Sequence, residues 1–187
     1  MASLAEIEAD ARVCVACPLA KGRTTVVFSA GNPQADLMFV GEAPGHDEDL
    51  QGEPFVGRSG KLLDRLIGEE LGLDRTGCYI CNVVKCRPPG NRDPLPAEVD
   101  ACRHYLEAQV EEVAPRVIVT LGNFAARTLL STTETVTRLR GTSYPYGRAV
   151  VVPTFHPSYG LRGGPVVVAQ MRADLVRAKQ LLAASAP

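Results

Sequence analysis

Residues 36–45 read Asp-Leu-Met-Phe-Val-Gly-Glu-Ala-Pro-Gly, which joins a short apolar run to a glycine-flanked turn. Three more short apolar runs rich in β-branched residues follow at residues 78–84, 116–121 and 149–155. Helical patterns separate most of these runs, and such alternation predicts a parallel sheet covered by helices. The functional loops of a sheet of this kind lie at the carboxyl ends of its strands.

Five segments have the pattern of helices. The first opens with Ser3 and Glu6 as a capping box, and the second begins near Ser59 and ends at Gly72. The third follows Pro96 and places Cys102 on its buried side. The other two are expected over residues 123–130 and from near Pro165 to Leu182, whereas residues 135–146 are expected to form a hairpin or an extended loop.

The length of 187 residues suits one domain spanning residues 1–187, and 45% hydrophobic with 22% charged residues is ordinary for a globular core. The start, MASLAEIEAD, is acidic where a signal peptide would be basic, and no stretch has the roughly 20 apolar residues of a membrane span. We therefore expect a cytoplasmic protein with no membrane partner. The net charge of −1 gives no general attraction to nucleic acid, so contact with DNA must use a local basic face.

Four of the six cysteines have a spacing that favours a metal site. Cys14 and Cys17 form a C-x2-C pair followed by a proline, and Cys86 and Cys102 follow at C-x15-C spacing. Four thiolates suit either zinc or a four-iron, four-sulfur cluster, and the spacing does not separate the two. The alternatives are independent buried thiols, or disulfides, which a reducing cytoplasm disfavours.

A second C-x2-C pair, Cys78 and Cys81, lies inside a predicted strand. Residues three apart in an extended strand point to opposite faces of the sheet, so both thiols reach one metal only if the strand bends. We therefore exclude this pair from the predicted metal site.

Three loops that follow predicted strands carry suggestive polar groups: residues 41–59, 82–92 and 156–164. Taken alone, the first is a tight turn followed by a solvated acidic run, and His156 or Asn82 is a structural hydrogen-bonding residue. In combination they suggest a site for a planar base. The Asn82 carboxamide presents a donor and an acceptor in one plane, as needed to read an imide edge, and His156 stands at a turn fixed by proline.

Five motifs occur in a set order along the chain: Gly41-Glu42-Ala43-Pro44-Gly45, Glu48-Asp49, Pro54-Phe55-Val56-Gly57-Arg58-Ser59-Gly60, Asn82-Val83-Val84-Lys85-Cys86-Arg87-Pro88-Pro89 and His156-Pro157-Ser158. Together with the cysteine spacing, they resemble family 4 uracil-DNA glycosylases from Cys14 to about Arg162. The resemblance implies an α/β fold, a three-layer α/β/α sandwich with a central four-stranded parallel sheet. It also implies a four-iron, four-sulfur (4Fe-4S) cluster rather than zinc.

The same resemblance implies a monofunctional enzyme of base-excision repair. Such an enzyme flips uracil out of single- or double-stranded DNA and hydrolyses the N-glycosidic bond, which leaves an abasic site without a lyase step. The expected partner is uracil-containing DNA, and the chain is expected to act as a monomer.

Individual roles follow from the resemblance as well. The cluster ligands would be Cys14, Cys17, Cys86 and Cys102. The uracil pocket would be formed by Glu42, Ala43, Phe55, Asn82 and His156, with Phe55 stacking on the base. Catalysis would depend on His156 at the carbonyl that gains negative charge, with Glu42 and Glu48 near the base and the attacking water. Contacts to DNA are expected, from charge and position near the three loops rather than from the resemblance, at Arg58, Ser59, Lys85, Arg87, Leu161 and Arg162.

Two other classes of protein remain possible from sequence: a cluster-containing electron carrier or redox sensor, and a zinc-stabilised nucleic-acid-binding module. The first leaves Phe55, Asn82 and His156 without a joint task, and the second predicts a colourless protein. A related class that traps uracil-DNA covalently has an inserted basic loop with a histidine. Residues 85–102 lack that insertion and contain no histidine, so turnover is expected.

Overall fold

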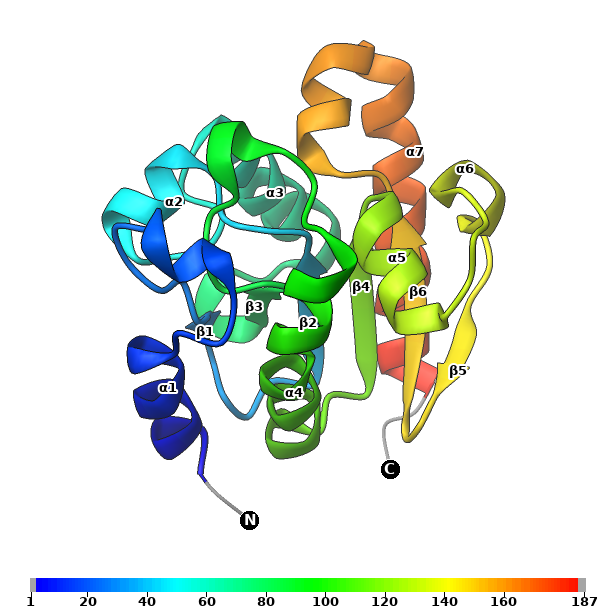
Figure 1. Cartoon of the computed structure of the whole chain (residues 1–187). Helices are drawn as coiled ribbons and strands as arrows, with labels where there is room; N and C mark the ends of the chain where they lie inside the picture. Colours follow the sequence, from blue (N-terminus) through cyan, green and yellow to red (C-terminus); the bar gives the residue numbers. More distant parts are fainter. Residues whose placement is uncertain (1–2, 185–187) are drawn as a thin grey trace.

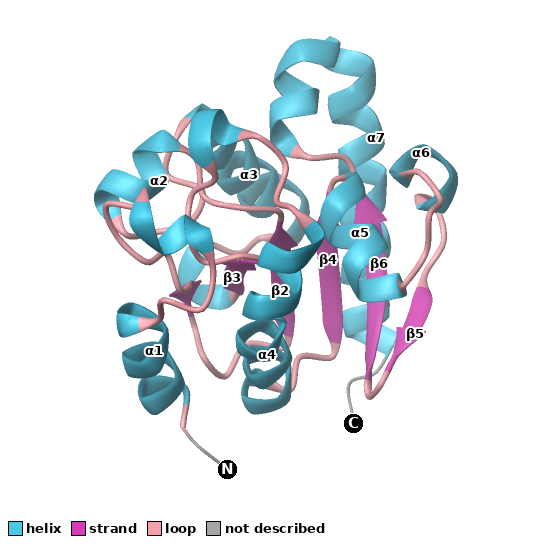
Figure 2. Ribbon diagram, viewed as in Figure 1, coloured by secondary structure: helices cyan, strands magenta, loops and turns pink. Residues whose placement is uncertain are grey.

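The computed structural model describes residues 3–184, which form three layers with a sheet between two sets of helices (Figure 1, Figure 2). The strand order of the sheet is β1-β3-β2-β4-β6-β5. Its four inner strands are parallel: β3 (Tyr79–Asn82), β2 (Leu37–Gly41), β4 (Val117–Leu121) and β6 (Ala149–Thr154). These are the four strands that the apolar runs predicted.

The prediction of a four-stranded sheet is wrong in its strand count, because two antiparallel strands extend the sheet to six. β1 (Ala30–Gly31) pairs with β3, and β5 (Tyr144–Tyr146) pairs with β6. The two edge strands have only 2 and 3 residues. Strands of that length are too short to show an apolar alternation in the sequence.

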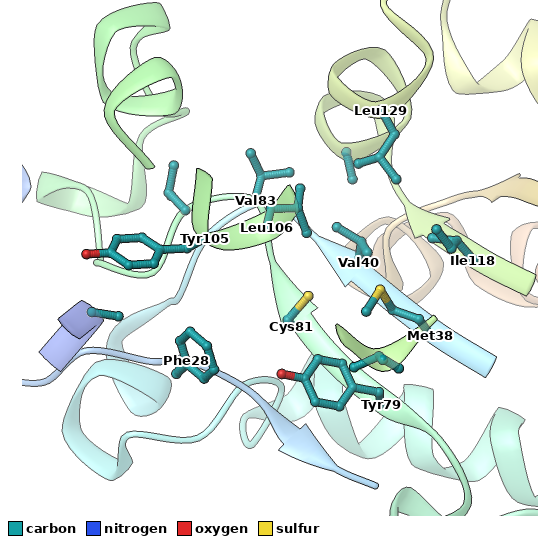
Figure 3. Packing of buried hydrophobic residues seen from close by; sticks show 14 of the residues in the cluster. Phe28, Met38, Val40, Tyr79, Cys81, Val83, Tyr105, Leu106, Ile118 and Leu129 are labelled. Atoms are coloured by element: carbon teal, nitrogen blue, oxygen red, sulfur yellow. The ribbon is translucent and has the colours of Figure 1, made fainter. Parts of the chain in front are cut away.

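Helices cover both faces of the sheet, and one hydrophobic cluster fills each interface. On one face lie α1 (Leu4–Val13), α4 (Pro96–Val113) and α5 (Asn123–Leu130), whose apolar side chains pack with strand residues such as Met38 and Ile118 (Figure 3). On the other face lie α3 (Arg58–Leu66), its π-helical continuation η2 (Ile67–Leu71) and α7 (Pro157–Ala184). The predicted three-layer sandwich is therefore confirmed.

Most helix ends follow their sequence signals. Ser3 and Glu6 form the capping box of α1, and Gly72, with a φ of 68°, ends the continuation of α3. In α7 the chain leaves the helical conformation at Gly164, which has a φ of 72°, so a helical stretch does begin at Pro165 as expected. The sequence did not predict the helical segment before this kink, with which α7 starts at Pro157. None of the described helices has the length and apolar character that a membrane span requires.

Two short helices appear in segments that were expected to be loops. α2 (His46–Gln51) lies in the acidic run after β2, and α6 (Val136–Leu139) lies in the segment expected to be a hairpin or extended loop. The hairpin part of that expectation is confirmed by β5, which pairs with β6. Both helices are too short for a 3.6-residue period to appear in the sequence.

The four parallel strands end at one edge of the sheet. β2 has β3 on one side and β4 on the other. The connection from β2 to β3 therefore runs toward one edge of the sheet, and the chain then crosses back to place β4 on the other side of β2. Open α/β sheets bind ligands at such a switch point, outside the carboxyl ends of the strands.

Candidate active site

A cavity of about 1040 Å³ opens at the carboxyl edge of the sheet. The three loops singled out in the sequence all contribute to it, and a fourth loop after β4 contributes Gly122 and Asn123. Of the predicted site residues, the cavity is lined by Glu42, Ala43, Glu48, Phe55, Arg58, Ser59, Asn82, His156 and Arg162. Side chains far apart in the sequence therefore meet at one place.

Phe55 and Asn82 approach each other beside the backbone of Gly41. A Cβ built on Gly41 would lie 2.3 Å from Asn82 Oδ1 and 2.5 Å from Phe55 Cζ, so only glycine fits at this position. The carbonyl of Phe55 accepts a hydrogen bond from Arg75 Nη1 at 2.9 Å. A Cβ on Gly60 would lie 1.7 Å from the same carbonyl oxygen. Close backbone packing therefore fixes the aromatic ring.

Phe55 also has an unusual backbone conformation, with a φ of 56°. The left-handed region is strained for a bulky side chain, and such strain tends to persist where the surrounding structure demands it. Here the conformation places a large ring in the wall of the cavity.

Asn82 presents an unpaired acceptor to the cavity. The residue is 2% exposed, and its Oδ1 has no hydrogen-bond partner among the described residues. A buried acceptor left unpaired costs about 1–3 kcal/mol. A ligand that donates a hydrogen bond to this oxygen would recover that energy.

His156 is neutral and has a defined tautomer. Its Nδ1 accepts a hydrogen bond from the Ser158 backbone N–H at 3.1 Å and lies 2.8 Å from Ser158 Oγ. Since Nδ1 is the acceptor, the proton of the neutral ring is assigned to Nε2. The pKa of His156 is lowered to about 4, mainly by burial and also by the charge of Arg162, against the opposing charge of Glu48. At neutral pH the ring therefore offers an N–H donor without a positive charge.

The rings of His156 and Phe55 stand close together, with centroids 5.8 Å apart and an interplanar angle of 34°. Gly122, in the fourth loop, has a φ of 95°, and a Cβ there would lie 3.0 Å from the His156 Cβ. Sequence analysis assigned no chemistry to this loop. Its signal was a glycine directly before the first residue of α5.

Glu48 serves mainly to hold the first loop together. Its Oε1 accepts from the backbone N–H groups of Val56 and Gly57 at 3.0 and 3.1 Å, and its Oε2 accepts from Gly45 N–H at 3.1 Å. The carboxylate thus joins the start of α2 to the residues just after Phe55. Both oxygens are engaged with backbone, which makes Glu48 a poorer candidate than Glu42 for orienting water.

Glu42 and Asp93 form a pair of interacting carboxyl groups in the cavity wall. The pKa of Glu42 is raised to about 7, mainly by burial and also by the charge of Asp93 and a hydrogen bond with it. A carboxyl group with a pKa near the working pH is suited to act as a general base. The sequence analysis missed Asp93, which lies one residue beyond the predicted loop, because aspartate is common in solvated turns.

The residues predicted to contact DNA lie in different surroundings. Arg58, Ser59 and Arg162 line the cavity, and Leu161, next to Arg162 in the chain, is 43% exposed. Arg87 is half-buried, and its Nε donates a hydrogen bond to Asn91 Oδ1 at 2.7 Å.

The prediction that Lys85 contacts DNA is wrong, because its side chain points into the core. Lys85 is 1% exposed, and its Nζ donates to the Asn82 carbonyl at 2.6 Å and to Gln109 Oε1. The two valines before Lys85 are also buried, so this whole segment runs through the interior.

The four cysteines of the predicted metal site, Cys14, Cys17, Cys86 and Cys102, line one small cavity. Cys102 is half-buried, whereas its helical pattern predicted a buried position. Arg23 Nη1 lies beside them and donates to the Cys86 sulfur at 3.4 Å and to the Cys14 carbonyl at 2.7 Å. Within residues 3–184, no group of three or more His, Cys, Asp or Glu side chains is arranged around a single-ion position.

The other C-x2-C pair behaves as the strand geometry predicted. Cys78 belongs to the hydrophobic cluster on one side of the sheet, and Cys81 belongs to the cluster on the opposite side. Its exclusion from the predicted metal site is therefore supported.

Comparison with known proteins identifies the class of protein that this fold and site represent. The model of the uracil DNA glycosylase superfamily matches residues 28–175, and the chain belongs to this superfamily.

Within the superfamily, the chain is similar to proteins named type-4 uracil-DNA glycosylase. The relative from Thermotoga maritima is 50% identical over 151 residues, which cover 80% of this chain and 78% of the relative. For the relative from Archaeoglobus fulgidus the identity is 46% over 166 residues, covering 84% and 83% of the two chains. For the relative from Sulfurisphaera tokodaii it is 44% over 169 residues, covering 86% and 77%. The resemblance drawn from the motifs is thereby confirmed.

Proposed function

We propose that this protein excises uracil from DNA by hydrolysing the N-glycosidic bond, which leaves an abasic site. The observation that carries the proposal is the meeting of three complementary groups in one slot. Phe55 offers a flat ring, Asn82 an unpaired amide oxygen, and His156 a neutral N–H donor. A uracil extruded from the DNA stack offers the matching face, imide N–H and carbonyl oxygens.

Recognition of the base would rest on Asn82. Its Oδ1 would accept the imide N–H of uracil, and its amide N–H₂ would donate to a neighbouring carbonyl. Phe55 would stack on the base, and the backbone beside Glu42 and Ala43 would close the pocket. Flipping the base costs a few kcal/mol of unstacking, least for a mispaired or single-stranded uracil.

His156 would stabilise the departing base. As the bond between the sugar C1′ and the uracil nitrogen breaks, its electron pair leaves with uracil, and negative charge develops on the carbonyl oxygens. A hydrogen bond from Nε2–H becomes stronger as that charge grows, so it lowers the barrier to bond breaking. Because the ring is neutral, uracil can leave as an anion without first taking a proton from His156.

Glu42 would orient the water that replaces uracil on the sugar. Its carboxylate can accept a proton from this water as the oxygen bonds to C1′. Glu48 would support the site as a brace, since its oxygens hold the loop that carries Phe55. This arrangement assigns the water to Glu42 and the loop geometry to Glu48.

An Asp93→Asn variant should move the acid limb of the pH–rate profile to lower pH. If ionised Glu42 is required, the rate of uracil release falls as the pH drops through its pKa of about 7. Removing the charge of Asp93 lowers that pKa, whereas burial still holds it above the ordinary value. The measurement is kcat for uracil release across a pH series, with the wild type as reference. An unchanged acid limb would exclude Glu42 as its source.

The other charged or titratable residues that line the same cavity are His46, Asp47, Glu48, Arg58, Arg92, Arg127, His156 and Arg162. These residues are retained in the Asp93→Asn variant. A shift of the acid limb of the pH–rate profile would therefore report on the Glu42–Asp93 pair. Arg92 is already engaged by Glu98 through two hydrogen bonds of 2.8 and 2.6 Å.

DNA would pass over the mouth of this cavity. Arg58, Ser59, Arg87 and Arg162 would contact phosphates, and the exposed side chain of Leu161 would fill the gap left by the flipped base. No lyase step is expected, because the amine of Lys85 is buried and bonded within the protein. We further propose that the protein works as a cytoplasmic monomer.

A 4Fe-4S cluster is proposed on Cys14, Cys17, Cys86 and Cys102. Four thiols in one cavity, with the Arg23 guanidinium at the Cys86 sulfur, are a donor set suited to an anionic cluster. When bound, the cluster would supply a rigid cross-link rather than a reacting group. The four cysteines would thereby tie the segment after α1 to α4 and to the loop after β3.

The proposed function is tested by release of free uracil from an oligonucleotide that contains one deoxyuridine. The expected result is multiple turnovers of uracil, with none from a matched oligonucleotide that has deoxycytidine at that position. Folded protein that releases no uracil would overturn the proposal. A stable protein–DNA adduct on a denaturing gel would contradict turnover.

A further inference from the structure

Lys85 is a buried cation that has no role in the proposed recognition of uracil, in its hydrolysis or in DNA contact. It is 1% exposed, and none of the ion pairs among the described residues includes it. A buried ammonium without a negative partner costs several kcal/mol. Lysine is almost never fully buried unless it is paired.

The ammonium binds the end of the strand that reads uracil in the proposed function. Its Nζ donates to the carbonyl oxygen of Asn82 at 2.6 Å. Hydrogen bonds from a charged donor are roughly twice as strong as neutral ones. The peptide that follows Asn82, and with it the direction of the Asn82 side chain, is therefore held by the cation.

A second acceptor fixes the cation itself. Nζ donates to Gln109 Oε1, and Gln109 Nε2 donates to the Phe28 carbonyl and to the Tyr79 hydroxyl, each at 3.0 Å. Gln109 is 0% exposed. Tyr79 and Phe28 belong to the core cluster between the sheet and α4, as Figure 3 shows. The network therefore joins β3, α4 and the segment before β1.

Lys85 also lies next to the Phe28 ring, with Nζ 5.8 Å from the ring centroid, and next to the cysteine cavity. Lys85 lines this cavity together with Cys14, Cys17, Cys86 and Cys102. Iron and sulfide held by four thiolates form an anionic group, and its electrochemical potential depends on nearby charge. The cysteine cavity is therefore where the missing negative partner of the ammonium would lie.

We propose that Lys85 is a positioning residue that joins the two sites: its ammonium orients Asn82 and provides the internal counter-charge to a cluster on the four cysteines. The proposal rests on the proposed function for the role of Asn82, and on the donor set of this chain for the cluster. Lys85 is not among the residues that line the uracil cavity, and it acts through Asn82.

The test is a Lys85→Met variant, which keeps the length and apolar body of the side chain and removes the charge. Lys179→Met is the matched control, because Lys179 is exposed and bonds only the Glu70 carbonyl at 3.2 Å. Both proteins are purified with their iron and sulfide and compared in kcat, in KM for uracil-DNA, in visible absorbance near 400 nm and in reduction midpoint potential.

For Lys85→Met we expect kcat to fall about 10- to 100-fold, since a misplacement of about 1 Å can cost 100-fold. KM for DNA should stay within about threefold, because the phosphate contacts are intact. The midpoint potential should become more negative than in the control, because loss of a positive charge disfavours the reduced cluster. Unchanged kcat and unchanged potential would overturn the proposal.

A Gln109→Glu variant keeps the test decisive if Lys85→Met does not fold. It retains the ammonium and gives it a carboxylate partner, which should lower the midpoint potential and reduce kcat less than Lys85→Met does. If the wild type releases no uracil, the proposed function fails and the midpoint potential alone decides. A shift then supports the counter-charge, and an unchanged value overturns it.

Discussion

Replacing His156 by alanine is expected to lower kcat for uracil release by about 100- to 1000-fold, the usual effect of removing one preorganised donor to a developing oxyanion. The structure places a neutral ring in the slot, with Nδ1 occupied by the Ser158 backbone and Nε2–H left as donor. The loss should appear in kcat more than in KM, because the hydrogen bond is strongest when the base carries negative charge.

The pH dependence of the His156→Ala variant provides a control. Burial and the charge of Arg162 lower the pKa of His156 to about 4, so the ring is already neutral well below pH 7. The alanine variant should therefore keep the wild-type acid limb near neutrality, at a lower overall rate. A variant within about threefold of the wild-type kcat would exclude His156 from stabilising the leaving group.

Replacing Asn82 by alanine is expected to lower kcat/KM for uracil release by about 10- to 100-fold, because the imide edge loses its hydrogen-bonding partner. The same change should not destabilise the free protein as a buried polar deletion commonly does. Oδ1 of Asn82 is buried without a partner, and its removal relieves a cost of about 1–3 kcal/mol. We therefore expect a protein with reduced activity whose Tm is unchanged or higher.

Steady-state kinetics and thermal unfolding of the same Asn82→Ala preparation separate the two effects. Asp174→Ala is a useful comparison, since Asp174 is buried but accepts hydrogen bonds from Thr154 and Arg140. Its removal takes away the acceptor of the Thr154 hydroxyl and the carboxylate partner of Arg140, which keeps only its hydrogen bond to the Gln170 carbonyl among those described, and should lower Tm. A fall in Tm for Asn82→Ala equal to that of Asp174→Ala would show that Asn82 is a structural amide rather than a reader of the base.

The fold was predictable where local rules determine it. The capping box of Ser3 and Glu6, the stop at Gly72 and the opposite facing of Cys78 and Cys81 depend only on a few neighbouring residues. The four inner strands were predictable because strands buried on both faces are continuous apolar runs. The edge strands and α2 are too short for any periodicity, and their pairing is decided by the rest of the fold.

The site was predictable in its loops and less so in its details. Motifs identified the residues that line the cavity. The charge of Lys85 and its place beside a site loop suggested that it faces DNA, whereas its burial depends on how Gln109 and the cysteines fold around it. Asp93 and Gly122 were missed for a similar reason. Each is an ordinary turn residue in sequence, and its relation to Glu42 or His156 exists only in three dimensions.

The close approach of the main chain at Gly41 to Phe55 and Asn82 limits what the slot admits. Side chains can rotate to make room for a larger ligand, but the main chain at Gly41 can move only if strand β2 moves with it. The backbone of Phe55, which carries the ring, is also held by Gly60 and Arg75, because both contact its carbonyl group. If the slot binds an extruded uracil as proposed, a base that pressed against this wall would have to move the Phe55 ring together with the first turn of α3, so the wall should select bases by shape as well as by hydrogen bonds.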